Sequence, residues 1–320
     1  MSVSVSKVCE SILRAHTDAN RFVIAYSGGL DSHVLLHVMS EIKKNHPAMI
    51  LQAVHVNHQL NSAAEQWAMH CKKTAEFLHI PLMIETISID FQKGDSLEEN
   101  AREARYAVLQ KHLENAVLLT AHHANDQAET FLLQALRGAG PKGLSAMPVK
   151  KKLGESVMIR PLLSFSRASL EQYATDNQLQ WIEDDSNQDP RFRRNYLRHT
   201  VMPLLENTWP SVAENFSRSA RLLAEHESLI EDIAREDFLR VVENASDVSV
   251  LNLKKLLLLS DMRQRLVLRA WFAENHLRMP NAKHIKQIQQ DVLRAGMDAH
   301  PVFVLGKTRI VRKRGLLFIV

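Results

Sequence analysis

Cysteine is scarce in this chain, which has only Cys9 and Cys71 among its 320 residues. The two lie far apart and form no C-x-x-C pair, so the sequence indicates no disulfide framework, zinc ribbon or cysteine-ligated cluster. No stretch approaches the roughly 18 consecutive apolar residues of a membrane helix, and the N-terminus lacks the apolar core of a signal peptide. These absences predict a cytoplasmic protein without a membrane anchor.

The charge balance is mildly basic, with 40 Lys and Arg against 36 Asp and Glu and a pI of about 9.0. This excess permits a polyanionic partner, but it also suits many ordinary enzymes. Hydrophobic residues make up 45% of the chain, enough for a sizeable core, and the length allows two domains. Composition therefore predicts a well-packed protein but does not identify its ligand.

Strand-like and helix-like segments alternate through the first half of the chain. The expected strands are residues 22–27, 50–58, 82–89, 116–123 and 156–163. A helix-like stretch follows each strand, as in a parallel sheet covered on both faces. After Pro203, charged segments with helical periodicity dominate, and short strands return only at the end. We predict a doubly wound, mostly parallel α/β domain over residues 1–210 and a smaller helical domain with short terminal strands over 211–320.

The segment "SGGLDS", residues 27–32, follows the first expected strand and opens a helix. Ligands of open α/β sheets bind at the carboxyl ends of the strands. Two glycines let backbone N–H groups approach an anion, and the serine hydroxyls and the helix dipole add to the attraction. The segment matches no Walker A loop, dinucleotide fingerprint or nucleophile elbow. It predicts a phosphate-binding loop in which Asp31 needs a partner such as Mg²⁺ or a reacting group.

Two later stretches place polar residues at the ends of other expected strands. In "HVNH", His55 and Asn57 share one strand face, and either nucleotide contact or plain packing explains them. In "AHHANDQAET", a helix is expected to start near Asn125, with Asp126 and Glu129 on one side of its first turn. Acids there can simply complement the helix dipole. Facing a phosphate loop, however, they are suited to bind an ammonium group and to keep an amine deprotonated.

A third stretch, "DPRFRRNYLRHTVMPLL", is basic. A helix is expected to start at Asp189-Pro190 and to stop at Pro203. The stretch carries Arg191, Arg193, Arg194, Tyr196 and Arg198. Either a solvated basic face or an RNA contact, with arginines on phosphates and the tyrosine on a base, accounts for this composition.

The segment "SGGLDS" resembles the signature of the PP-loop ATP pyrophosphatases, which cleave ATP to AMP and pyrophosphate. Six further stretches, "HVNH", "SLEENAREARYAVL", "AHHANDQAET", "RGAGPKGLSAM", "IRPLL" and "WIEDDSNQDPRFRRNYLRHTVMPLL", follow in the order found in the tRNA(Ile)-lysidine synthetase family. The chain resembles this family most closely from residue 20 to about 210. The resemblance implies an enzyme that uses ATP and Mg²⁺ to join L-lysine to the wobble cytidine of a tRNA(Ile) with a CAU anticodon, through an adenylated cytidine.

The resemblance also implies roles for individual residues. The ATP-binding residues would be Ser27, Gly28, Gly29, Leu30, Asp31, Ser32, His55, Asn57 and Arg102. Asp31 would also hold the metal, and Asp126 and Glu129 would bind lysine. Arg105 would complete a catalytic set with Asp31 and the two acids, one of which is the candidate base. The five residues of the basic stretch and the helical domain would contact the tRNA.

Two features depart from the family pattern. Asn125 stands where some relatives have a second acid, so a metal role at this position is in doubt. Many members also have a further terminal domain that helps recognise the acceptor end of the tRNA, and it is expected to be absent because the sequence ends at Val320. The alternatives are a tRNA thiolase, which would need a persulfide or a cysteine-held iron–sulfur cluster, and a catalytically inactive nucleotide- or RNA-binding protein. The sequence leaves the oligomeric state open and allows a homodimer.

Overall fold

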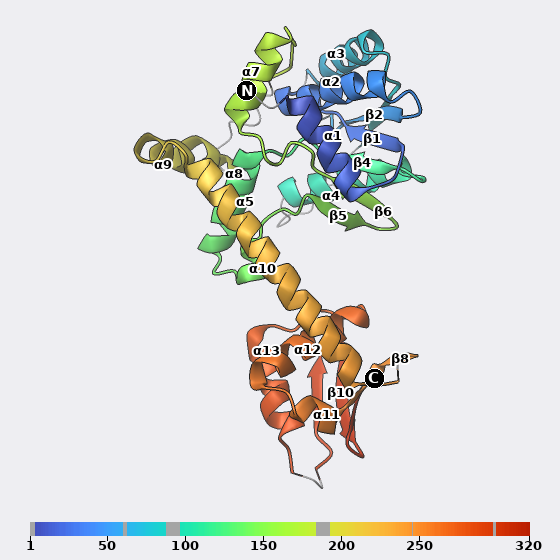
Figure 1. Ribbon diagram of the computed structural model, residues 1–320, viewed down its shortest axis with the longest axis vertical. Coiled ribbons are helices and arrows are strands. Elements are labelled where there is room, and N and C mark those ends of the chain that lie inside the picture. Colours follow the sequence, from blue (N-terminus) through green and yellow to red (C-terminus); the bar gives the residue numbers. More distant parts are fainter. Residues whose placement is uncertain (1–3, 60–62, 88–96, 184–192, 245, 297–298) are drawn as a thin grey trace. The chain divides into compact units, whose positions relative to one another are not determined.

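The computed structural model describes residues 4–59, 63–87, 97–183, 193–244, 246–296 and 299–320. The chain divides into two compact units, Met1–Ala224 and Glu225–Val320, and the elements of both are labelled in Figure 1. The division falls inside helix α10 (Val212–Val241), whereas the sequence prediction placed it between residues 210 and 211. Each unit is described by itself.

The first unit is built on a six-stranded sheet of order β3-β2-β1-β4-β6-β5. The strands are β1 (Arg21–Ala25), β2 (Ile50–Asn57), β3 (Leu82–Thr86), β4 (Val117–Leu119), β5 (Lys150–Leu153) and β6 (Ser156–Ile159). All pair in parallel except β5, an antiparallel edge strand. The strand order reverses between β1 and β4, which is where sheets of this kind bind ligands. The predicted doubly wound, mostly parallel sheet is therefore confirmed.

Helices cover both faces of this sheet because strand side chains alternate between the faces. On one face, α1 (Val5–His16), α2 (Leu30–Asn45), α3 (Ala64–Phe77) and α7 (Arg167–Asp176) share a core with strand residues such as Ile24 and Leu119. On the other face, α4 (Leu97–Lys111) places Leu109 in a second core with Val23 and Leu118. The carboxyl ends of β1 and β4 thus open between two packed layers.

A third core holds the basic stretch against the helix that follows β4. Ala128 of α5 (Ala124–Leu136) packs with Met202 of α9 (Met202–Thr208) and with Val212 of α10. The short helix α8 (Arg193–Tyr196) and a π-helical turn, η2 (Leu197–Val201), lead directly into α9. The prediction that Pro203 stops the helix is wrong, because Pro203 lies near the start of α9, which continues directly from η2 to Thr208.

The second unit combines helices with an antiparallel sheet of order β7-β8-β11-β10-β9. Its strands are β7 (Val242–Asn244), β8 (Asp247–Asn252), β9 (Val302–Leu305), β10 (Thr308–Lys313) and β11 (Leu316–Ile319). Its helices are α11 (Leu253–Leu257), α12 (Asp261–Glu274), α13 (Ala282–Gln287) and the π-helical η3 (Ile288–Leu293), and Trp271 and Phe272 of α12 are fully buried. The terminal strands were predicted, whereas β7 and β8 were not. Within the described residues, no helix combines the length and apolar character needed to cross a bilayer.

Candidate active site

The loop between β1 and α2 has a backbone that only glycine can follow at its sharpest point. Gly28 has a φ of +87°, and a Cβ there would lie 2.8 Å from Cys71 Sγ. Ser32 Oγ lies 3.0 Å from Ser27 Oγ, accepts the Ser27 N–H at 3.2 Å and donates to the Gly29 carbonyl at 3.0 Å. Gly29 is the N-cap of α2 and has no side chain to offer the first N–H groups. Those groups suit an anion, as predicted for this loop.

Asp31 lies in the first turn of α2 with one oxygen engaged and the other unpaired. Its Oδ2 accepts a hydrogen bond from Arg167 Nη1 at 3.3 Å and lies 3.6 Å from His123 Nε2. Its Oδ1 is buried and has no hydrogen-bond partner. A carboxylate oxygen of this kind beside a phosphate loop fits Mg²⁺, which commonly takes one or two protein carboxylates together with phosphate oxygens and water. No cluster of three or more His, Cys, Asp and Glu in the described ranges forms a ready-made metal site.

His123, which the sequence did not single out, joins the loop to the acid pair. It is the N-cap of α5: its Nδ1 accepts the Asn125 N–H at 3.2 Å, and Asp126 Oδ2 accepts the His123 N–H at 3.0 Å. This reciprocal capping box places the helix start at Ala124, so the expected start near Asn125 is nearly right. The acid three residues after His123 was the sequence signal that could have indicated this capping box.

The second nitrogen of the His123 ring faces two carboxylates. Nε2 lies 3.6 Å from Asp31 Oδ2 and 3.4 Å from Asp126 Oδ2. Burial lowers the pKa of His123, but the nearby carboxylates of Asp31 and Asp126 outweigh burial and raise the pKa above the ordinary value. His123 therefore connects the phosphate loop electrostatically with α5.

Asp126 and Glu129 lie together on the first turn of α5, as predicted, and both pair with arginines of the basic stretch. Arg194 donates to Asp126 Oδ1 at 2.9 Å and to Glu129 Oε2 at 2.8 Å. Arg198, in the π-helical turn η2, donates to Asp126 Oδ1 at 3.0 Å and to Glu129 Oε1 at 2.6 Å. We call these four residues the acid–arginine cluster. Two carboxylates and two guanidinium groups balance its charge.

The two acids of the acid–arginine cluster are nearly closed to solvent. The side chains of Asp126 and Glu129 retain 12% and 3% of their exposure. Burial raises the pKa of Asp126, but His123, Arg194 and Arg198 hold that pKa well below its usual range. Asp126 is therefore ionised at neutral pH and is a weak base.

The remaining residues of the basic stretch lie elsewhere. Arg193 is exposed, and the ring of Tyr196 is half exposed. Arg191 lies outside the described residues, as does the expected helix start at Asp189 and Pro190. Contact of this stretch with tRNA stays a prediction.

Of the predicted residues, His55 and Asn57 lie on β2, and Arg105 lies on α4. His55 is buried, with Nδ1 3.0 Å from the Tyr26 carbonyl, and Asn57 Oδ1 accepts the Gln59 N–H at 2.9 Å. Arg105 Nε donates to His58 Nε2 at 3.2 Å. Burial lowers the pKa of His58 to about 4, and Arg105 lowers it further. His55 and Asn57 thus hold the strand end in place, and their contact with a nucleotide stays a prediction.

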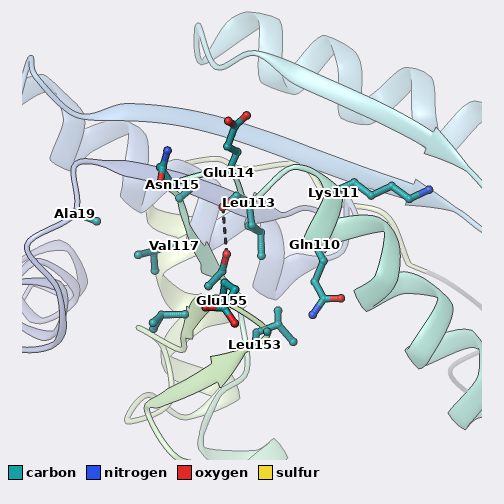
Figure 2. Close-up of a pocket in the computed structure, with 13 residues that line it drawn as sticks. Ala19, Gln110, Lys111, Leu113, Glu114, Asn115, Val117, Leu153 and Glu155 are labelled. Atoms are coloured by element: carbon teal, nitrogen blue, oxygen red, sulfur yellow. Dashed lines mark hydrogen bonds between the residues drawn. The ribbon is translucent and has the colours of Figure 1, made fainter.

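Two cavities of the first unit lie apart from these residues. One, of about 590 Å³, lies at the amino ends of β4 and β6 and is lined by Gln110, Lys111 and Glu155 among others (Figure 2). In the wall of this cavity, Ser156 Oγ donates a hydrogen bond to the Leu113 carbonyl at 3.2 Å. The other, of about 330 Å³, lies between α4 and the β5–β6 hairpin. The larger cavity is at the edge of the sheet opposite the phosphate loop, so we do not assign the chemistry to it.

Comparison with known proteins finds one family match in each of the two units. Residues 1–205 match the PP-loop domain family, and residues 251–318 match the TilS substrate binding domain. The tRNA(Ile)-lysidine synthase of Coxiella burnetii is 48% identical over 304 residues, which cover 95% of this chain and 67% of that protein. The tRNA(Ile)-lysidine synthase of Pseudomonas fluorescens is 42% identical over 311 residues, covering 96% and 70%.

Among solved structures, the U34-tRNA thiolase NcsA from Methanococcus maripaludis is similar in fold. Its TM-score is 0.59 at 17% identity, over 69% of this chain and 78% of that one. At this level of identity the likeness concerns the fold alone.

Proposed function

This chain belongs to the tRNA(Ile)-lysidine synthase family, and from that premise we propose that it uses ATP to join L-lysine to the wobble cytidine of the tRNA(Ile) with a CAU anticodon. One observation carries the proposal at the level of this chain's own residues. The phosphate loop and the acid pair Asp126 and Glu129 meet at the carboxyl ends of β1 and β4, and His123 bridges them. A phosphate site beside an ammonium site is what the two substrates require.

In the first step, the cytidine 2-oxygen would attack the α-phosphorus of ATP, forming an O–P bond as the bond to pyrophosphate breaks. The loop of residues 27–32 would hold the leaving pyrophosphate through backbone N–H groups and the Ser27 and Ser32 hydroxyls. Mg²⁺, held by Asp31 through its unpaired Oδ1, would neutralise phosphate charge when bound. Arg105 would add positive charge from α4, where that charge favours the developing anion, whereas Arg102 lines a separate cavity between α4 and the β5–β6 hairpin.

In the second step, the lysine ε-amine would attack C2 of the adenylated cytidine. A C–N bond forms, the bond from C2 to the adenylate oxygen breaks, and AMP leaves. The amine must lose a proton to a base. Because the pKa of Asp126 is held low, we assign the binding of the ammonium form to Asp126. Glu129, on the same helical turn, is the other acid that the proton can reach.

The acid–arginine cluster sets a condition on lysine binding. Glu129 and Asp126 already accept five close hydrogen bonds from Arg194 and Arg198, so a lysine amine has to displace at least one guanidinium group. A displaced arginine has a natural partner in RNA phosphate, which it binds in the same bidentate manner as a carboxylate. We infer that lysine and tRNA binding favour each other.

The second unit would bind the tRNA, which is supported by the substrate binding domain match over residues 251–318. Its strand β10 carries Arg309, Arg312 and Lys313, and Arg314 follows, as expected for a surface that meets phosphates. Modification of tRNA implies a cytoplasmic enzyme. The homodimer stays a prediction.

A tRNA thiolase is not favoured by the two cysteines. Cys9 and Cys71 are both buried, and they form no disulfide with each other. Burial raises the pKa of each thiol to about 12, so neither is available as a thiolate at neutral pH.

The test supplies the protein with ATP, Mg²⁺, bulk bacterial tRNA and each labelled amino acid in turn, followed by mild alkali that strips aminoacyl esters. We expect alkali-stable label from lysine only, with AMP released in proportion. Stable label from another amino acid, or tRNA-dependent AMP release without lysine incorporation, would contradict the proposal.

A further inference from the structure

The cavity of about 330 Å³ between α4 and the β5–β6 hairpin is separate from the phosphate loop and the acid pair. Its lining includes Arg102, Glu103, Tyr106, Gln110, Lys151 and Met158. None of residues 27–32 lines it, nor do Asp126 and Glu129. We call it the α4–β5 pocket. Its volume is at the small end of the roughly 300–1,000 Å³ range of ligand sites, enough for a ligand of modest size.

Positive charge exceeds negative charge around the α4–β5 pocket. Arg102 and Lys151 line it opposite a single acid, Glu103. Arg160 adds a third cation: it lies two residues after Met158, on the face of the sheet that α4 covers. The pocket is therefore short of an anion.

Arg160 makes this shortage costly. The residue is 2% exposed, its Nη1 donates to the Pro148 carbonyl, and its Nε is buried without a partner. Among the described residues, no carboxylate pairs with it. Burial lowers the pKa of Arg160, and although Tyr106 raises that pKa, Arg102 lowers it. A buried guanidinium group without a counter-charge is unfavourable, and an anion nearby would offset that cost.

The pocket also offers an aromatic surface. The Arg102 guanidinium carbon lies 5.5 Å from the centre of the Tyr106 ring. Proteins hold unpaired nucleotides by stacking bases on such rings and on guanidinium planes while cations bind the phosphates. ATP has its own phosphate loop on a different part of the sheet, so RNA is the better match for this combination.

The pocket is electrostatically linked to the active site. His122, next to the bridging His123, has its pKa lowered to about 3 by burial, with further lowering by Arg160, Arg194 and Arg102. The arginines of the pocket therefore act on a residue at the end of β4.

We propose that the α4–β5 pocket binds one unpaired nucleotide of the RNA substrate, with its phosphate between Arg102 and Lys151 and its base on the Arg102–Tyr106 pair. This inference rests on the proposed function, which supplies the RNA. In this proposal, Arg160 is a buried positive charge that attracts the phosphate.

The edge strand β5 offers a matched pair of variants. Lys151 lines the pocket, and its neighbour Lys150 donates to the His16 carbonyl at 2.8 Å, on the α1 side of the sheet. Because strand side chains alternate, Lys152 shares the face of Lys150 and not that of Lys151. All three lysines are exposed, so neither Lys151→Gln nor Lys152→Gln should perturb folding. Both remove one positive charge, which equalises their long-range electrostatic effect.

The experiment measures equilibrium binding of an unmodified tRNA(Ile) transcript to the full chain over a series of salt concentrations, with ATP binding measured in parallel. We expect Lys151→Gln to weaken RNA binding about threefold or more at low salt and to reduce the salt slope by about 0.7, as for one lost phosphate contact. Lys152→Gln should retain the wild-type slope. ATP affinity should be the same in all three proteins.

A second pair tests the base contact. Tyr106→Phe keeps the ring and should bind RNA like the wild type, whereas Tyr106→Leu should lose at least about fivefold in RNA affinity with an unchanged salt slope.

Equal effects of Lys151→Gln and Lys152→Gln would overturn the pocket assignment. So would a loss of ATP affinity in Lys151→Gln without a loss of RNA affinity, which would identify the anion as ATP. If wild-type protein forms lysidine while the lysine variants do not differ, only the pocket assignment fails. If wild-type protein binds no tRNA, the proposed function fails with it.

Discussion

Replacing Arg198 with alanine removes half of the positive charge from the acid–arginine cluster. Arg198 donates to Glu129 Oε1 at 2.6 Å, to Glu129 Oε2 at 2.9 Å and to Asp126 Oδ1 at 3.0 Å. Its own side chain retains 34% exposure, whereas that of Glu129 retains 3%. The substitution therefore leaves a buried carboxylate with a single cationic partner, Arg194.

The magnitude follows from these exposures. Breaking a fully buried ion pair costs about 3–5 kcal/mol, and an exposed pair contributes at most about 1 kcal/mol. Because Arg198 is partly solvated, we expect Arg198→Ala to lower the free energy of unfolding by about 2 kcal/mol, between these limits. Arg193→Ala, in the adjacent helix and exposed, is the matched control and should change it by less than about 0.5 kcal/mol.

L-Lysine should then act differently on the two proteins. In Arg198→Ala its ammonium group can take the vacated position beside Glu129, and at one hundred times the Kd it would restore about 2.7 kcal/mol. In the wild type without tRNA, lysine has to displace a guanidinium group and should stabilise far less. Urea unfolding of wild type, Arg198→Ala and Arg193→Ala, each with and without lysine, measures all of these quantities. Equal stabilisation of all three proteins by lysine, or equal stability of the two variants, would refute the reasoning.

Three further predictions concern the loop, the acid pair and the cysteines. Gly28→Ala puts a side chain at a φ of +87° and 2.8 Å from Cys71 Sγ, so it should destabilise the fold by about 1–3 kcal/mol. The same substitution should abolish ATP binding in a calorimetric titration. Unchanged ATP affinity would show that the loop does not hold the nucleotide. Because the folded-state pKa of Asp126 is lowered, its contribution to stability is present above the ordinary pKa of 3.8 and is lost as pH falls through the folded-state pKa. The wild type should therefore lose more stability on acidification than Asp126→Asn. If the free energies of urea unfolding of the two proteins fell in parallel with pH, that result would contradict the assignment. With thiol pKa values near 12, Cys9 and Cys71 should react slowly with a thiol-reactive dye in the folded protein, and both should react with it in urea. Fast reaction of either cysteine in the folded protein would contradict this and would favour a thiol-based reaction.

Much of the first unit is predictable because buried parallel strands are short apolar runs. Segments such as "FVIA" and "AVLL" have few alternative explanations, and the loop "SGGLDS" fixes where the carboxyl ends of the strands lie. The edge strand β5 escapes prediction because three of its four residues are lysines, and strand-like apolar alternation is absent. Strands β7 and β8 escape because they continue a helical segment and alternate weakly.

The acid–arginine cluster could not be predicted from local pattern. Periodicity places Asp126 with Glu129, and Arg194 with Arg198, each pair on one face of its own helix. That the two faces meet depends on the packing of α5 against α9 and α10 through Ala128, Met202 and Val212. Contacts across 68 residues of sequence, such as that of Arg194 with Asp126, follow from the fold and not from spacing.

The central claim is tested most directly by following the nucleoside at the wobble position. A tRNA(Ile) transcript with a CAU anticodon would be incubated with the protein, ATP, Mg²⁺ and L-lysine, digested to nucleosides and analysed by mass spectrometry, while AMP is quantified in the same reaction. The account predicts that one cytidine per tRNA is replaced by lysidine and that one AMP appears for each. Unchanged cytidine in a reaction where the same protein binds ATP and tRNA would contradict it.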